Sequence, residues 1–264
     1  MATLESYEVV MLLSRIKTMT GMHWLVLFAV ISVSWFMLFA MAVPAEMRVY
    51  SKLYGADFWV ALCTVTPDAA GLARLFLMWA LMSAAMMAPT ALPAFGTYDD
   101  LVRSTGRGRF SHLVIGYLTI WLGFAALAAC IQMMLTRWGA VDLLGQSQSP
   151  ILTASLLVGA GLYQFSALKE ACLSKCRRPI SFFMQHWEEG AWRNGLRLGL
   201  VCLGCCWALM LLGFVGGVMN LAFMGLATVM MILEKLPDIG RWLTRPLGFG
   251  LIAWGLFALV GAFI

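Results

Sequence analysis

The stretch from Leu168 to Asn220 reads LKEACLSKCRRPISFFMQHWEEGAWRNGLRLGLVCLGCCWALMLLGFVGGVMN. It holds five of the seven cysteines of the chain and one of its three histidines, His186. A polar first part is followed by a long apolar run, a pattern typical of an interfacial segment that leads into a membrane helix. We therefore expect these cysteines to lie at one mouth of a bundle of membrane helices.

The spacing of the cysteines indicates two groups, each on one face of a helix, because residues three and four apart lie one turn above one another. The groups are Cys172 with Cys176, and Cys202, Cys205 and Cys206 with Met210 one turn further on. Soft sulfur ligands suit Cu(I) or Zn(II) far better than Mg(II) or Ca(II). The stretch therefore predicts a metal site, with copper or zinc as its ion.

The composition of the whole chain indicates a membrane protein. Of its 264 residues, 62% are hydrophobic and 12% are charged, and the mean hydropathy is +0.86, whereas soluble domains are about half apolar and about a quarter charged. We expect residues 1–264 to form a single all-α domain, a polytopic transmembrane helical bundle in contact with lipid. The net charge of +5 does not indicate nucleic-acid binding, since in such a chain the placement of charge around the spans matters more than its sum.

About seven spans are expected from apolar runs of the length that a bilayer requires. The apolar middle of the 44–73 segment is too short to cross, so we expect it to lie at the interface or to fold back. The run from Arg197 to Glu234 is too long for one span, and the turn signal at 216–220 divides it in two. The other expected spans are His23–Val43, Arg74–Gly96, Ser111–Leu135, Ile151–Leu168 and Leu247–Ile264.

The basic residues predict the orientation. With seven spans and a cytoplasmic N-terminus, 14 lysines and arginines flank the spans inside and four flank them outside, which favours a C-terminus on the outer side. Cys172, Cys176 and His186 then lie on the cytoplasmic side, where thiols are kept reduced and structural disulfides are not expected.

Further residues carry alternative readings. Met78, Met82 and Met86 recur every four residues, about 6 Å per step on a helix, which suits either ordinary core packing or a thioether relay for Cu(I). His186 suits either a metal ligand or an interfacial surface residue. Glu234 is expected to form an interfacial ion pair with its neighbour Lys235.

Motifs of catalysis are missing from the sequence. It contains no G-x-S-x-G, no Walker loop and no H-E-x-x-H, and three scattered histidines argue against a multi-histidine metal centre. We therefore do not expect an enzyme.

In its cysteine motifs and in several neighbouring stretches, the chain resembles a bacterial family of predicted metal-binding integral membrane proteins, long described as a domain of unknown function. The resemblance covers about 74–237 and rests on WALMSAAMMAP (79–89), LYQFSALKEACLSKCRRP (162–179), HW (186–187), CLGCCW (202–207) with Met210, GVMN (217–220) and Glu234-Lys235. One branch of that family is associated with supplying copper to a tyrosinase. The resemblance implies a copper-handling protein of the bacterial cytoplasmic (inner) membrane.

The sequence thus leads to one main hypothesis and two alternatives. The main one is a Cu(I) metallochaperone or transfer protein that supplies a partner cuproenzyme. Its metal-binding residues would be Cys172, Cys176, His186, Cys202, Cys205, Cys206, Met210, Met82 and Met86. The first alternative is a non-catalytic accessory subunit of a membrane oxidase or monooxygenase complex, with structural zinc or no metal. The second is a thiol redox protein that uses Cys172 and Cys176.

Overall fold

The computed structural model describes residues 21–42, 68–142, 144–237 and 239–261. Apart from an isolated bridge between Val141 and Ser147, the regular structure of these residues is helical, so the all-α prediction is confirmed for them. Most of the 44–73 segment lies outside the described residues. The helices are α2 (Met22–Ala42), α5 (Ala69–Thr105), α6 (Phe110–Arg137), α7 (Pro150–Tyr163), α8 (Ala167–Arg177), α9 (Pro179–His186), η2 (Trp187–Glu189), α10 (Ala191–Leu211), α11 (Gly213–Gly216), α12 (Leu221–Lys235) and α13 (Ile239–Val260).

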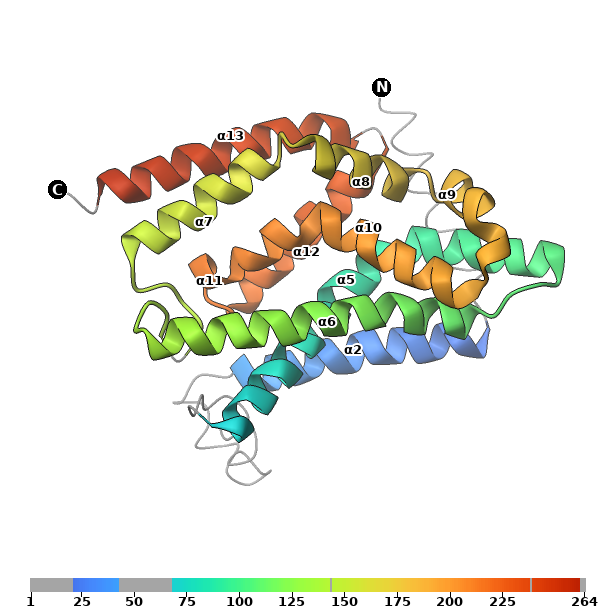
Figure 1. The fold of residues 1–264 in the computed structure, drawn as a ribbon, viewed down its shortest axis with the longest axis horizontal. Helices are drawn as coiled ribbons and strands as arrows, with labels where there is room; N and C mark the ends of the chain where they lie inside the picture. The colour runs from blue at the N-terminus through green and yellow to red at the C-terminus, as the bar shows by residue number, and fades with distance from the viewer. Residues whose placement is uncertain (1–20, 43–67, 143, 238, 262–264) are drawn as a thin grey trace.

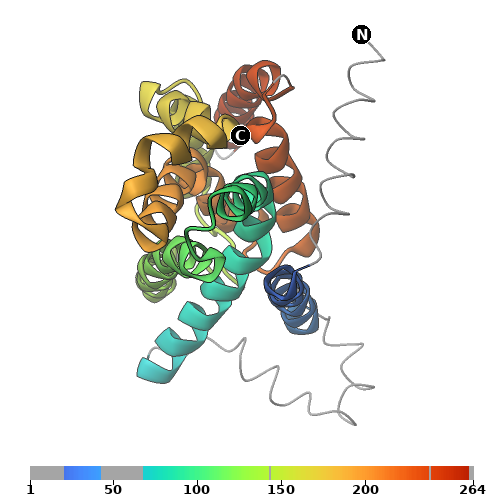
Figure 2. The ribbon, with the colours of Figure 1, turned by 90° about the vertical axis from the view of Figure 1, so that its right-hand side faces the viewer.

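The helices form a bundle in which α10 and α12 project between α6 and α13 in the view of Figure 1. Helix α10 packs along α6, α13 packs along α7, and α2 packs against α5. Seen after a quarter turn, α5 crosses the molecule obliquely and α2 lies at the edge of the bundle (Figure 2). One face of the cysteine-bearing helix α10, which includes Cys202, Cys205 and Cys206, is therefore buried against its neighbours, while its other face is exposed.

Five helices in the described part of the chain are long and apolar enough to cross a membrane: α2, α5, α6, α10 continued through α11, and α13. A sixth span is possible if α7 and α8, which meet at a bend of 62° between Tyr163 and Ala167, are counted together. Helix α12 follows the predicted turn at 216–220 but has only 15 residues, or about 22 Å at 1.5 Å per residue. The multi-pass character of the chain is thus confirmed, but the number of seven spans is not.

Helix α5 is longer than the predicted span, because it continues through Pro89 and Pro93 to Thr105. Proline has no N–H for the carbonyl four residues earlier, so Pro89 leaves the carbonyl of Ala85 without its helical partner. The indole of Trp35 in α2 donates a hydrogen bond of 2.9 Å to that carbonyl. A contact between two helices therefore satisfies the group that the proline exposes.

Two glycines let α6 and α10 approach closely. A Cβ atom at Gly195 would lie 2.2 Å from the carbonyl oxygen of Leu113, and one at Gly116 would lie 2.5 Å from that of Trp192. Since real Cβ atoms do not come this close to a backbone oxygen, the crossing requires glycine at both positions. The close crossing brings Tyr117, the residue after Gly116, against Cys202 of α10.

Candidate metal centre

Three thiols of α10 form a compact buried cluster. The sulfur atoms of Cys202, Cys205 and Cys206 all lie within 4.8 Å of one another, and each side chain is at most 2% exposed. The thiols of Cys205 and Cys206 are 3.1 Å apart, and both donate to the carbonyl of Cys202 at 3.0 Å. The i, i+3, i+4 spacing predicted this shared face, and we name these residues the thiol cluster.

Side chains from three other helices complete the surroundings of Cys202. The ammonium of Lys235, at the end of α12, donates to the Cys202 sulfur at 3.1 Å and to the hydroxyl of Thr90 in α5 at 2.6 Å. The hydroxyl of Tyr117 in α6 lies 3.1 Å from the same sulfur and donates to the carbonyl of Met87. The cluster is therefore a polar, sulfur-rich point at which α5, α6, α10 and α12 meet.

The second cysteine pair lies on α8, which packs against α10. Cys172 and Cys176 are half-buried, and their four-residue spacing on a helix is as predicted. The Cys172 sulfur would lie 2.6 Å from a Cβ atom at Gly204, so it rests directly on the α10 backbone between two cysteines of the cluster. Cys176 is close enough to interact with the Cys205 thiol. The structure thus brings all five cysteines of the stretch to one helix–helix contact.

The prediction that Glu234 pairs with Lys235 is wrong. The Glu234 carboxylate accepts two hydrogen bonds from the ammonium of Lys169 in α8, at 2.8 and 3.0 Å. Both side chains are almost fully buried, at 1% and 3% exposure. Arg177 of α8 donates to the backbone carbonyl of Glu234 through two nitrogens. Consecutive side chains of a helix point about 100° apart, which is why Glu234 turns to α8 while Lys235 turns to Cys202.

The predicted methionines all lie in the core. Met82, Met86 and Met210 are 1–2% exposed, and the methyl group of Met82 lies 3.9 Å from the Cβ position of Gly213, just after α10. Burial of this kind suits core packing as well as metal transfer. Their role as ligands stays a prediction.

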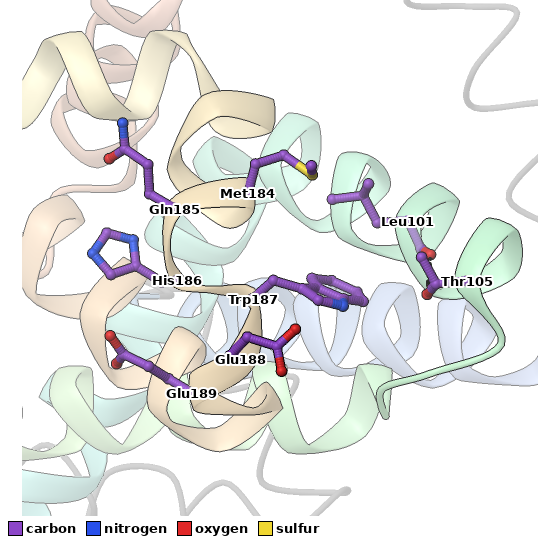
Figure 3. A pocket seen from close by; sticks show the side chains of 8 residues that line it. All are labelled: Leu101, Thr105, Met184, Gln185, His186, Trp187, Glu188 and Glu189. Atoms are coloured by element: carbon purple, nitrogen blue, oxygen red, sulfur yellow. Dashed lines mark hydrogen bonds between the residues drawn. The ribbon is translucent and has the colours of Figure 1, made fainter.

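His186 lies apart from the thiol cluster. Its ring nitrogen Nδ1 is 2.9 Å from the carbonyl of Phe182, and its own carbonyl accepts from Asn194, which is eight residues or about 12 Å along α10 from Cys202. With Trp187, Glu188 and Glu189 it lines a surface pocket of about 270 Å³. Figure 3 shows the His186 ring and the Trp187 indole pointing in opposite directions, without convergence on a common point. A ligand role for His186 stays a prediction.

Sequence reasoning missed Lys235, Tyr117 and Thr90 as neighbours of the cysteines. A signal existed for two of them, because a tyrosine in the middle of an apolar run and a lysine at the end of one both need polar partners when buried. Nothing in the sequence identified a cysteine as that partner.

The chain was compared with curated proteins, with solved structures and with models of protein families. The searches of the curated proteins and of the solved structures found no match. A family model described as "PpoB2: Copper chaperone" matches residues 76–258, which include the thiol cluster, the α8 pair and Lys235. The match covers well over half of the chain and extends the predicted resemblance into α13, so the chain belongs to the PpoB2 copper chaperone family.

Proposed function

We propose that this chain binds Cu(I) on its cysteines and transfers it to a partner copper enzyme. The observation that carries the proposal is the thiol cluster, in which three buried sulfur atoms converge within 4.8 Å. Thiolate sulfur is the ligand type that selects Cu(I). Membership of a copper chaperone family supports a non-catalytic role with copper as cargo.

In this proposal the α8 pair loads the cluster. Cys202 lies 11 residues, or about 17 Å, after Ala191, the first residue of α10, within the first half of the apolar helix that runs from Ala191 to Gly216. Cys172 and Cys176 are half-buried, whereas the three thiols of the cluster are buried, so the pair is the more accessible of the two groups. Copper would bind the pair first and move to the cluster by exchange of one thiolate ligand for another.

Delivery would continue through the methionines towards the outer side. Met210 extends the cysteine face of α10, and Met82 and Met86 are buried on α5. Thioethers bind Cu(I) without deprotonation and do not form disulfides, which suits the oxidising side of the membrane. With seven spans and a cytoplasmic N-terminus in a bacterium, as the basic residues predict, this route would run from the cytoplasmic side of the membrane to its outer side.

The proposal is tested by the metal content of the protein. Wild type and the Cys172→Ser/Cys176→Ser variant would be purified anaerobically in mild detergent and analysed by mass spectrometry. We expect copper near one atom per chain in wild type and a clear loss in the variant. Zinc that survives competition by copper, or no metal in either protein, would instead support the accessory-subunit alternative.

Gly204→Ala tests the loading step without removal of a thiol. A methyl group there would lie 2.6 Å from the Cys172 sulfur, and this short side chain can rotate away at little cost in stability. We expect slower copper loading from an external Cu(I) complex, with equilibrium affinity for copper retained. Stopped-flow measurement of loading would check this, with Gly159→Ala as the control, since a Cβ atom at Gly159 meets nothing within 4 Å. Equal loading rates in the two variants would show that contact of Cys172 with α10 is not needed.

A further inference from the structure

Lys235 ends an apolar helix, yet its charged group points into the bundle. Its ammonium binds Cys202 and Thr90, from α10 and α5, and so joins three helices at one point. A lysine at a helix end in a membrane protein ordinarily extends to the headgroup region. The inward orientation therefore calls for a compensating interaction at the cluster.

The compensating charge does not come from a carboxylate. Within the described ranges, the ion pairs of Asp and Glu residues do not include Lys235, and the adjacent Glu234 is bound to Lys169. Lys235 is half-buried, and a cation withdrawn from water without an anionic partner is costly. The sulfur atom of Cys202 is thus the group in contact with Lys235 that can carry negative charge.

Binding of Cu(I) to this cluster would supply that negative charge permanently. Two thiols and one copper ion react as Cu⁺ + 2 RSH → [Cu(SR)₂]⁻ + 2 H⁺, with no change of oxidation state, and the two protons pass to water. The complex carries one negative charge, and the ammonium of Lys235 brings the site to neutrality. Attraction between opposite charges is strong where the dielectric constant is low.

The surrounding structure holds Lys235 in this place. Lys169 binds the side chain of the preceding residue, Glu234, and Arg177 binds its carbonyl. A Cβ atom at Gly240 would lie 2.1 Å from that same carbonyl oxygen, so the start of α13 closes on it from another direction. The backbone next to Lys235 is fixed by both α8 and α13, which keeps the ammonium against Cys202.

We propose that Lys235 is the counter-cation of the copper site, a positioning residue that strengthens Cu(I) binding by neutralising the copper–thiolate complex. This inference rests on the proposed function, since it assigns a role to Lys235 at the same cluster. It identifies a determinant of copper affinity that is not itself a ligand.

The test compares Cu(I) affinities of Lys235 variants, measured anaerobically in detergent by competition with a chromogenic Cu(I) chelator. Lys235→Gln retains a hydrogen-bond donor but loses the charge, and Lys235→Arg retains the charge. Loss of an outer-shell partner of a metal ligand costs about 10- to 100-fold in affinity, so we expect that loss for Lys235→Gln and rescue by Lys235→Arg. Arg245→Gln, which removes an exposed positive charge from α13, controls for the change in net charge. If Lys235→Gln does not fold, Lys235→Met provides the uncharged comparison.

A loss smaller than tenfold in the uncharged variant, or an arginine variant as weak as the uncharged one, would overturn the inference. Failure of the proposed function would look different. In that case wild type itself would not bind Cu(I), or its binding would not depend on the cysteines.

Discussion

Lys169→Met is expected to be among the most destabilising single substitutions in this chain. The Lys169–Glu234 pair is almost fully buried, and loss of the ammonium leaves an uncompensated carboxylate in the core. Removal of one partner from a buried pair costs about 3–5 kcal/mol. Thermal unfolding of the detergent-solubilised protein, followed by circular dichroism, measures the effect.

Two controls make this result specific. Arg193→Met replaces an exposed cation of α10, and we expect a change within about 0.5 kcal/mol. The double variant Lys169→Met/Glu234→Met removes both charges, and it should regain most of the lost stability because an apolar pair of similar volume is often as stable as a buried ion pair. A Lys169→Met protein as stable as wild type would contradict the buried pair.

Cys202→Ser is expected to have the largest effect on copper binding. Cys202 is the cysteine that contacts both Lys235 and Tyr117, and serine offers Cu(I) a hard oxygen in place of a soft sulfur. Since even outer-shell changes cost about 10- to 100-fold, we expect Cu(I) affinity to fall by more than about 100-fold. Competition with a Cu(I) chelator under anaerobic conditions would measure it.

The matched control is Cys130→Ser, the same substitution at an exposed cysteine of α6. We expect this variant to bind copper as wild type does. Equal affinities of the Cys202→Ser and Cys130→Ser proteins would mean that the thiol cluster does not bind the ion.

Local spacing predicted the parts of this site that lie on one helix. The i, i+3, i+4 pattern placed Cys202, Cys205 and Cys206 on one face, and the four-residue spacing placed Cys172 and Cys176 on another. The apolar runs also located the main helices, although α5 extends beyond its predicted end. These features depend on backbone geometry alone, which sequence separation fixes.

Contacts between distant helices were not predictable in the same way. Lys235 and Cys202 are 33 residues apart, and Lys169 and Glu234 are 65 apart, so sequence neighbours such as Glu234 and Lys235 were paired instead. The indole of Trp35 donates to the Ala85 carbonyl that Pro89 leaves without its helical partner, and the sequence around Trp35 does not reveal this contact. The direction of a side chain at a helix end follows from tertiary packing.

The ends of two helices explain why fewer than the seven predicted spans are found among the described residues. Helix α7 is shorter than the bilayer core requires because the chain bends at Gln164–Ser166, and α12 is short because it begins after the predicted turn at 216–220 and already ends at Lys235. A hydropathy pattern records the total apolar length, and it does not record a bend within that length.

The central claim is that Cu(I) is bound by sulfur at the thiol cluster. X-ray absorption at the copper K-edge, on protein loaded anaerobically with one equivalent of Cu(I), tests it most directly. The account predicts a coordination shell made of sulfur alone, which is lost in the Cys202→Ser/Cys205→Ser/Cys206→Ser variant. A shell dominated by nitrogen or oxygen, or one unchanged in that variant, would contradict it.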